Sequence, residues 1–260
     1  MAIAITAAEP WTVRRRRARE LLAARPYAAE LLRLYLALCE VWEPAWTEAV
    51  ARPPATGDLP GHIAAQVMPG VVEATLAAGP EHLKQMAVAR FHEGDLEAIV
   101  SAWLAAEEMA PVDAYLARSA AAPVLEAMGA KGGDSADRRH CPSCGGLPQL
   151  AFVESSGDPL LTAPRQLLCS RCAQAWTYPR MVCAGCGSTD SSSQPIYADV
   201  DQLPHLRVDA CEACRKYLLT VELTKDAASV PCVDELVGIP LDLYAQERGF
   251  TKITANLMGI

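Results

Sequence analysis

The amino-acid sequence predicts an α+β protein with an N-terminal all-α helical domain, two tandem cysteine-bearing β units and a C-terminal helix. Two observations carry this prediction. Eight of the ten cysteines lie between residues 141 and 214, in four Cys-x-x-Cys pairs flanked by strand-forming residues. The first half is instead rich in alanine, with leucines at helical spacing. We place an all-helical domain at residues 1–135 and a duplicated metal-binding domain at residues 136–260.

The composition is that of a globular protein. The chain has 260 residues, of which 51% are apolar and 21% charged, enough for one large or two medium domains. The formal net charge is −8. Four thiolates around a divalent ion add −2 per site, so two filled sites would bring the charge to about −12. Such a charge disfavours nucleic acid as a partner, because nucleic-acid binding depends on neutralising phosphates.

Two successive helices are expected between residues 12 and 44. Pro26 suits the first turn of the second helix, which leucines at spacings of three and four continue. Pro44 is expected to end it, because proline disrupts a helix interior. The four arginines from Arg14 to Arg17 form either a solvated helix face or a docking surface for an acidic partner. Charged residues interrupt the apolar region that an export signal would need after them, so we expect a cytoplasmic protein without membrane insertion.

The remainder of the first half predicts helices of moderate length, separated by Pro- and Gly-rich breaks. Asp95 is a candidate N-cap for a helix whose apolar stripe begins at Leu96. No phosphate-binding loop, dinucleotide-binding turn or nucleophile elbow occurs, and the histidines are scattered. We therefore expect no catalytic residue and no organic cofactor. A polar, glycine-rich connector at residues 129–139 leads to the cysteine-rich region.

An internal repeat organises residues 141–214. Each of the first four cysteines recurs 42 positions later, so that each half holds two Cys-x-x-Cys pairs. Two such pairs supply the four thiolates of a tetrahedral metal site. A disulfide framework is not expected in the cytosol, and a redox motif would be a single pair. The eight predicted ligands are Cys141, Cys144, Cys169, Cys172, Cys183, Cys186, Cys211 and Cys214.

The pattern leaves two questions about the metal sites open. Sequential sharing, in which each repeat holds its own ion, is favoured over an interleaved arrangement because a repeat tends to be one structural unit. Four thiolates suit either iron or zinc. The Cys-Pro-x-Cys-Gly form at Cys141 is similar to the rubredoxin knuckle, which keeps iron in consideration. The predicted architecture is therefore two tandem rubredoxin- or zinc-ribbon-like β knuckle units, at about residues 141–172 and 183–214.

Several neighbouring residues have structural roles in this interpretation. Short antiparallel hairpins are expected around each ion, with Trp176 and Tyr178 on one strand face, packed in the core. Arg171 and Arg215 are expected to offset thiolate charge. Residues 233–248 have helical spacing that is interrupted at Gly238 and Pro240, and Gly249 is expected to end this helical segment. The remaining candidates are expected to be structural residues rather than ligands: His140, Cys39 and Cys232.

The cysteine region resembles the formate dehydrogenase accessory (maturation) proteins of the FdhE family. The resemblance is specific over residues 138–250 and loose over the first half. The second and fourth knuckles lack the glycine that follows the first and third. The matching residues are Cys141-Pro-x-Cys144-Gly145, Cys169-x-x-Cys172 with Trp176, Arg180-x-x-Cys183-x-x-Cys186, Cys211-x-x-Cys214 with Tyr217-Leu218, and Asp234-Glu235-Leu236 through Arg248-Gly249-Phe250.

This resemblance implies a non-catalytic, cytoplasmic assembly factor that binds iron in rubredoxin-like sites and interacts with the catalytic subunit of respiratory formate dehydrogenase. The cysteine pattern by itself leaves the two metal ions as iron or zinc. Neither nucleic acid nor a membrane is an expected partner, and a homodimer is left open. Two other functions fit the cysteine pattern. One is a rubredoxin-like electron-transfer protein, and the other is a zinc-ribbon module that binds protein or nucleic acid.

Overall fold

The computed structural model describes residues 10–129, 137–154, 164–257 and 259. The chain forms two compact units, Met1–Gly129 and Ala130–Met258. The boundary predicted near residue 135 falls outside the described residues. None of the helices in the described ranges combines the length and the apolarity needed to cross a bilayer.

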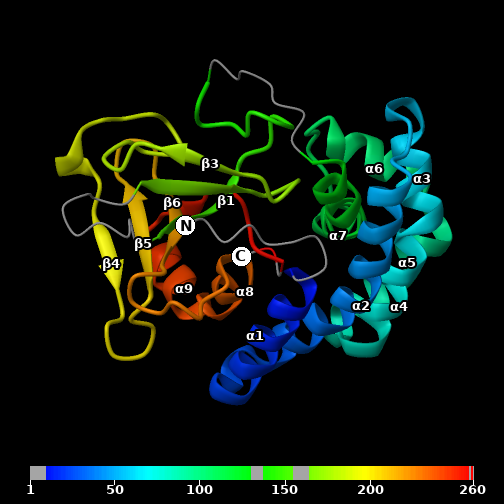
Figure 1. The fold of residues 1–260 in the computed structure, drawn as a ribbon, viewed down its shortest axis with the longest axis horizontal. Coiled ribbons are helices and arrows are strands. Elements are labelled where there is room, and N and C mark those ends of the chain that lie inside the picture. Colours follow the sequence, from blue (N-terminus) through cyan, green and yellow to red (C-terminus); the bar gives the residue numbers. More distant parts are fainter. Residues whose placement is uncertain (1–9, 130–136, 155–163, 258, 260) are drawn as a thin grey trace. The chain divides into compact units, whose positions relative to one another are not determined.

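The first unit is built from helices (Figure 1). Its centre is α2 (Ala29–Ala51), which packs against α1 (Pro10–Ala24), α4 (Met68–Ala78) and α7 (Pro111–Met128). The remaining helices are α3 (Leu59–Gln66), α5 (Glu81–Glu93) and α6 (Leu96–Leu104). The predicted cap of α6 is present, because the Asp95 side chain accepts a hydrogen bond from Ala98 N at 3.0 Å. The prediction of an N-terminal helical region is therefore confirmed.

The prediction that Pro44 ends the second helix is wrong, since α2 continues to Ala51. Proline removes one helix hydrogen bond, but packing on both sides of it keeps the helix intact. Before Pro44, Trp42 is buried and its Nε1 donates to Ser119 O at 2.7 Å. After Pro44, Ala49 is fully buried. Tertiary contacts thus override the local preference of proline.

The arginine run is not simply a solvated face. Arg14 donates to both carboxylate oxygens of Glu126, at 2.6 and 3.0 Å, and Arg15 pairs with Glu43 at 2.5 Å. The side chains of Arg14 and Arg15 are only 15% and 16% exposed. These two arginines therefore join helices within the first unit, whereas Arg16 is mostly exposed.

The second unit contains one seven-stranded sheet rather than separate hairpins around each ion. Strands β1 (Pro148–Val153), β2 (Arg165–Cys169) and β3 (Ala175–Tyr178) belong to the first repeat. Strands β4 (Ile196–Ala198), β5 (Leu206–Cys211) and β6 (Lys216–Glu222) belong to the second. The order is β3-β2-β1-β6-β5-β4, and β7 (Thr251–Lys252) pairs with β6. The predicted hairpins exist, but the parallel pairing of β1 with β6 joins them into one sheet.

The internal repeat is preserved in the register of the strands. Arg165 pairs with Tyr178 across β2 and β3, and Arg207 pairs with Thr220 across β5 and β6. Each residue of the second pair lies 42 positions after its counterpart, so the repeat in the cysteines extends to the backbone pairing.

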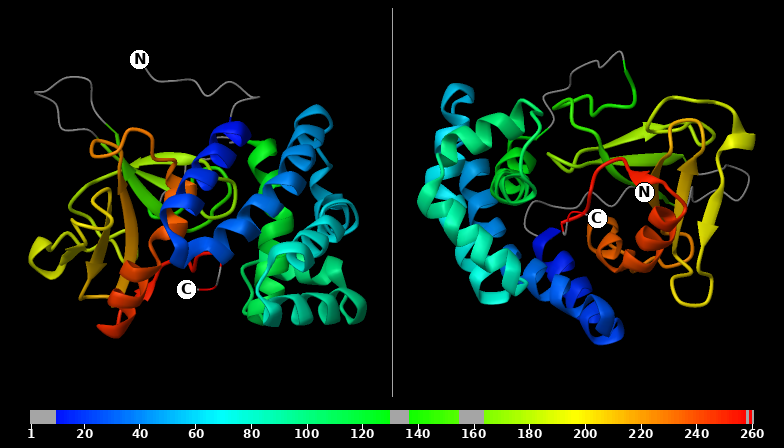
Figure 2. Two further views of the ribbon diagram at one scale, coloured as in Figure 1. Left: turned by 90° about the horizontal axis from the view of Figure 1, so that it is seen from below. Right: turned by 180° about the vertical axis from the view of Figure 1, so that it is seen from behind.

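Helices near the C-terminus cover one face of this sheet (Figure 1 and Figure 2). The helical segment predicted for residues 233–248, with its interruption at Gly238 and Pro240, is observed as α8 (Pro231–Asp234), a short 3-10 turn and α9 (Ile239–Glu247). Gly238 separates the turn from α9, and a Cβ there would lie 2.6 Å from a Leu219 methyl group. The close approach of this turn to the sheet therefore requires glycine, and the interruption follows from it.

Candidate metal centre

The first cysteine cluster is formed by two turns of the first repeat. One turn lies just before β1 and carries Cys141 and Cys144, and the other joins β2 to β3 and carries Cys169 and Cys172. The sulfurs of Cys141 and Cys172 are 3.7 Å apart, and those of Cys144 and Cys169 are 3.4 Å apart. All four sulfurs lie within 4.8 Å of one another.

The second cluster repeats this arrangement. The Sγ atoms of Cys183 and Cys214 are separated by 3.8 Å, and those of Cys186 and Cys211 by 3.9 Å. All four again lie within 4.8 Å. The cysteines are therefore grouped sequentially, one cluster in each repeat, and not in the interleaved arrangement.

The sulfur separations fit a tetrahedral metal ion. Metal–sulfur bonds of about 2.3 Å at tetrahedral angles place neighbouring sulfurs about 3.8 Å apart. The four separations above range from 3.4 to 3.9 Å, so little movement is needed to close either shell around an ion. The same sulfurs are too far apart to be disulfide-bonded. The chain thus has two clusters of four cysteines suited to metal binding, and this geometry does not distinguish iron from zinc.

All four knuckles turn back through a residue with positive φ directly after their second cysteine. Gly145 and Gly187 have φ of 71° and 78°. Ala173 and Arg215 hold the equivalent positions in the other two knuckles, with φ of 53° and 56°. Knuckles without the glycine therefore adopt the same backbone path, at the steric cost of a Cβ in the left-handed region.

Backbone hydrogen bonds hold the paired knuckles in the same way in both repeats. Gly145 N donates to Cys141 O and Gly187 N donates to Cys183 O, each at 2.9 Å. The Cys183 sulfur also accepts from Gly185 N at 3.3 Å. Such N–H groups stabilise a thiolate and so support its role as a ligand.

The two clusters differ in their exposure to solvent. In the first cluster three of the four cysteines are buried, and Cys144 is half-buried. In the second, Cys186 is exposed and Cys214 is half-buried. Burial raises the pKa of the Cys183 thiol and raises the pKa of Cys214 to about 12, so metal binding at the second cluster must displace protons.

The two aromatic residues of β3 share a buried face, as the alternation predicts. Trp176 and Tyr178 are 9% and 3% exposed, and Thr177 between them is exposed. Trp176 Nε1 donates to Arg138 O at 2.9 Å. The Tyr178 hydroxyl donates to Cys183 O at 3.0 Å and so links the first repeat to the second cluster.

The other candidates lie outside both clusters. His140 Nδ1 is 3.1 Å from Asp137 Oδ2, Cys39 is fully buried in α2, and Cys232 lies in α8. The Arg215 guanidinium lies 4.1 Å from the centre of the Phe250 ring and donates to Arg248 O. This cation–π contact fixes the guanidinium, and the expected offset of thiolate charge by this arginine stays a prediction.

Sequence reasoning missed two groups of buried polar residues. Lys252 Nζ lies 2.7 Å from Glu235 and 3.0 Å from Asp242, and all three residues are buried. His205 Nε2 lies 3.0 Å from Asp234 Oδ1, with Asp226 close to both. Residues far apart in sequence form these groups, so no local motif marks them.

Comparison with known proteins finds relatives of the cysteine region. Residues 181–258 match the family model for the FdhE C-terminal domain. The "Protein FdhE homolog" of Aquifex aeolicus is 33% identical over 122 residues, or 47% of this chain and 42% of the relative. That of Haemophilus influenzae is 32% identical over 117 residues, or 45% of this chain and 37% of the relative. The matched region therefore spans less than half the length of these relatives.

A solved structure extends the likeness to both units. The crystal structure of the FdhE protein from Pseudomonas aeruginosa aligns with a TM-score of 0.69, covering 95% of this chain and 94% of that chain at 21% sequence identity. At this identity the likeness concerns the fold. The predicted resemblance is thus confirmed: residues 181–258 match the FdhE C-terminal domain, and the chain shares its fold with the FdhE protein from Pseudomonas aeruginosa.

Proposed function

We propose that the chain is a cytoplasmic, non-catalytic assembly factor that binds two metal ions and docks on the catalytic subunit of formate dehydrogenase during its maturation. The observation that carries this proposal is the pair of clusters of four cysteines, which lie at the ends of strands of one sheet. Residues 181–258 of the chain match the FdhE C-terminal domain. The client comes from the family resemblance, and the eight clustered cysteines are the proposed ligands.

The clusters support a structural role for the ions. Cys169 and Cys211 end strands β2 and β5, and Cys141 and Cys183 anchor the turns opposite them. An ion in each cluster would tie these turns to the sheet, as structural metal sites do in small β units. The ions would in this way hold the docking surface in shape.

Co-purification tests the proposed docking. The tagged full chain, expressed with its own formate dehydrogenase, is expected to retain the catalytic subunit. A Cys141→Ser/Cys183→Ser variant, which removes one ligand from each cluster, should retain much less, while Cys232→Ser should match the unmodified chain. Full formate dehydrogenase activity in cells lacking the gene would reject the proposal.

The exposure of Cys186 favours electron transfer as a second candidate, because a solvent-accessible iron–thiolate site can exchange electrons. Elemental analysis of chain purified without metal affinity resins tests this alternative. Iron, together with visible absorption that bleaches on reduction, would support it. Zinc and a colourless protein would exclude it.

A further inference from the structure

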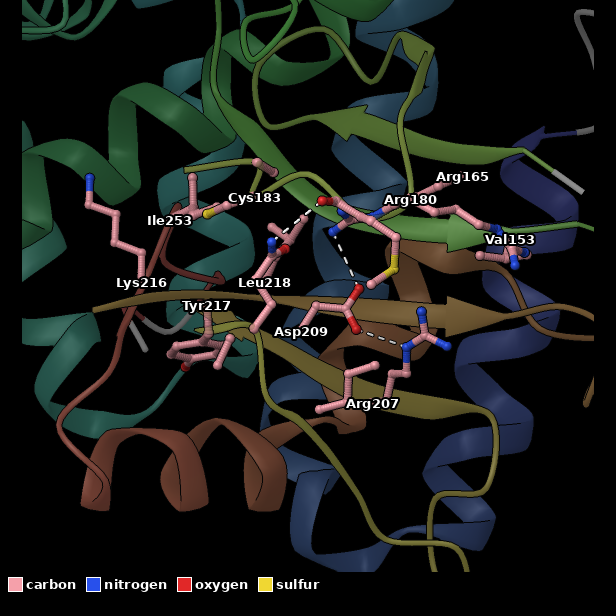
Figure 3. A pocket seen from close by; sticks show the side chains of 15 residues that line it. Val153, Arg165, Arg180, Cys183, Arg207, Asp209, Lys216, Tyr217, Leu218 and Ile253 are labelled. Carbon is pink, nitrogen blue, oxygen red and sulfur yellow. Dashed lines mark hydrogen bonds and ion pairs between the residues drawn. The ribbon is translucent and has the colours of Figure 1, made fainter. Parts of the chain in front are cut away.

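A pocket of about 250 Å³ opens in the second unit beside the second cluster (Figure 3). Strands of both repeats contribute to it, because β1 and β2 bring Val153 and Arg165 to the same place as Arg207 and Asp209 of β5. Cys183 also lines the pocket. Metal binding by the eight clustered cysteines does not explain the other residues that line this pocket.

Arg165 is the most unusual residue of the pocket wall, because its side chain is only 5% exposed. Its Nη2 lies 3.3 Å from Asp209 Oδ2, and its Nη1 donates to Val182 O at 3.2 Å. Its Nε has no hydrogen-bond partner among the described residues. A buried guanidinium with an unsatisfied N–H is costly, and an anion in the pocket would offset that cost.

Several cationic side chains line the pocket. Asp209 is shared between Arg165 and Arg207, as the dashed lines in Figure 3 show, and Arg207 also donates to Glu222 at 2.8 Å. Arg180 and Lys216 add two exposed cations to the lining. Asp209 is the one carboxylate among the lining residues, and a filled second cluster, whose Cys183 also lines the pocket, would add a charge of −2. Arg180 and Lys216 nevertheless have no ion-pair partner within the described part of the chain, and such unpaired cations attract anions.

Part of the pocket wall is apolar. Met181 and Ile196 line it and are 59% and 60% exposed, and Leu218 and Ile253 contribute further aliphatic surface. The volume is slightly below the range typical of sites for drug-sized ligands. The pocket therefore suits one anionic group with a short hydrocarbon part.

We propose that this pocket binds the carboxylate or phosphate group of a small ligand that also carries a short apolar segment. Arg165 and Arg207 would bind the anion, the exposed Arg180 and Lys216 on different sides of the pocket (Figure 3) would attract it, and the aliphatic side chains would cover its apolar part. Arg165 also donates to the carbonyl that precedes Cys183, so an occupied pocket would brace the second cluster.

Calorimetric titration of the metal-loaded full chain with hexanoate, hexyl phosphate and uncharged hexanamide tests the proposal. At least one anion should bind about tenfold more tightly than hexanamide, which corresponds to ~1.4 kcal/mol. The stronger of the two anions identifies the chemical class of the natural ligand. Equal affinity for all three probes, or no binding of either anion, would overturn the proposal.

Two double variants separate the pocket from general charge attraction. Arg180→Gln/Lys216→Gln should weaken anion binding by about tenfold. Arg19→Gln/Arg33→Gln makes the same change in net charge at exposed helical positions of the first unit, and should leave affinity unchanged. Equal losses in both variants would show that the anion binds only through overall charge, and would overturn the proposal.

A further measurement needs no substitution. In the zinc-loaded chain, the 15N–1H resonance of Arg165 Nε should shift on addition of the bound anion, because this group has an open hydrogen-bonding position. An unmoved resonance at saturating anion would exclude Arg165 from the site and overturn the proposal.

Discussion

The hydroxyl of Tyr178 donates a hydrogen bond to the backbone carbonyl of Cys183 at 3.0 Å. Tyr178 ends the last strand of the first repeat, and Cys183 begins the knuckle of the second cluster. Both residues are buried. The two repeats are therefore joined by this contact as well as by the pairing of β1 with β6.

Removing this hydroxyl should loosen the second cluster and leave the first intact. Tyr178→Phe would leave the Cys183 carbonyl without this donor, at a cost of about 1–2 kcal/mol in the free energy of unfolding. Metal bound by the second cluster should exchange faster with a chelator. Tyr197→Phe is the control, since the Tyr197 ring packs against Tyr244, which is exposed. Equal exchange rates in the two variants would show that the hydrogen bond does not support the cluster.

The two clusters should lose metal in order of their exposure. A chelator added to the chain loaded with two ions should remove the ion of the second cluster first, because Cys186 is exposed and the first cluster is mostly buried. Metal release followed by absorbance is expected to be biphasic. Cys186→Ser should abolish the fast phase alone, and Cys232→Ser should abolish neither. A fast phase that survives in Cys186→Ser would reverse the assignment.

The positive φ angles of Ala173 and Gly145 predict opposite changes in stability when alanine replaces glycine or glycine replaces alanine. Ala173 has φ of 53°, which glycine adopts without steric cost, so Ala173→Gly should stabilise the loaded chain by roughly 0.5–1 kcal/mol. Gly145 has φ of 71°, so Gly145→Ala should destabilise it by about 1 kcal/mol. Denaturant unfolding at fixed metal concentration measures both. A destabilising Ala173→Gly would mean that the lost side chain matters more than the backbone.

The cysteine pattern predicted the clusters well because the ligands of each knuckle are local, with two residues between them. Positive φ at Gly145 and Gly187 follows from the same local signal. Ala173 and Arg215 carry no such signal, and they adopt the same conformation because the hydrogen bonds and the sulfur positions of the knuckle require it.

The sheet and the pocket depend on non-local contacts. The parallel pairing of Ala151 with Thr220 joins strands almost seventy residues apart, and nothing in either strand specifies that partner. The same is true of Arg165 and Asp209, which meet because the repeats lie side by side. The prediction at Pro44 failed for the opposite reason. The local preference of proline predicts the end of a helix, but the packing of the residues around Pro44 keeps α2 helical.

The buried carboxylate of Asp242 predicts a pH dependence of stability. Burial raises the pKa of Asp242 to about 6, although Lys252 partly opposes this shift. The folded chain therefore binds this proton more tightly than the unfolded chain, whose Asp pKa is about 3.9. The contribution of Asp242 to stability is thus fully present below about pH 4 and is lost as the pH rises through about 6.

Asp242→Asn removes this titration and isolates its effect. Between pH 4.5 and 7.5 the unmodified chain should lose up to about 2 kcal/mol of unfolding free energy relative to the variant. Comparing the two chains at each pH cancels the proton release of the metal sites, which both share. A constant difference between them across this range would show that Asp242 is ionised throughout.

Gly146 predicts that the first cluster tolerates no side chain at this position. A Cβ on Gly146 would lie 2.9 Å from the Cys169 sulfur and 3.1 Å from Arg171 carbons, inside normal contact distance. Gly146→Ala should therefore displace Cys169 and weaken metal binding at the first cluster by tenfold or more, on the order of 1–3 kcal/mol of overpacking strain.

Metal stoichiometry under competition with a chelator measures this effect. It should fall from two ions towards one in Gly146→Ala, because only the first cluster is displaced. Gly57→Ala, where nothing lies within 4 Å of the new Cβ, is the control and should keep both ions. Ser188 holds the position equivalent to Gly146 in the second cluster, so that cluster already accommodates a side chain there. Loss of metal from the second cluster instead would therefore mean that the two clusters are coupled through the sheet.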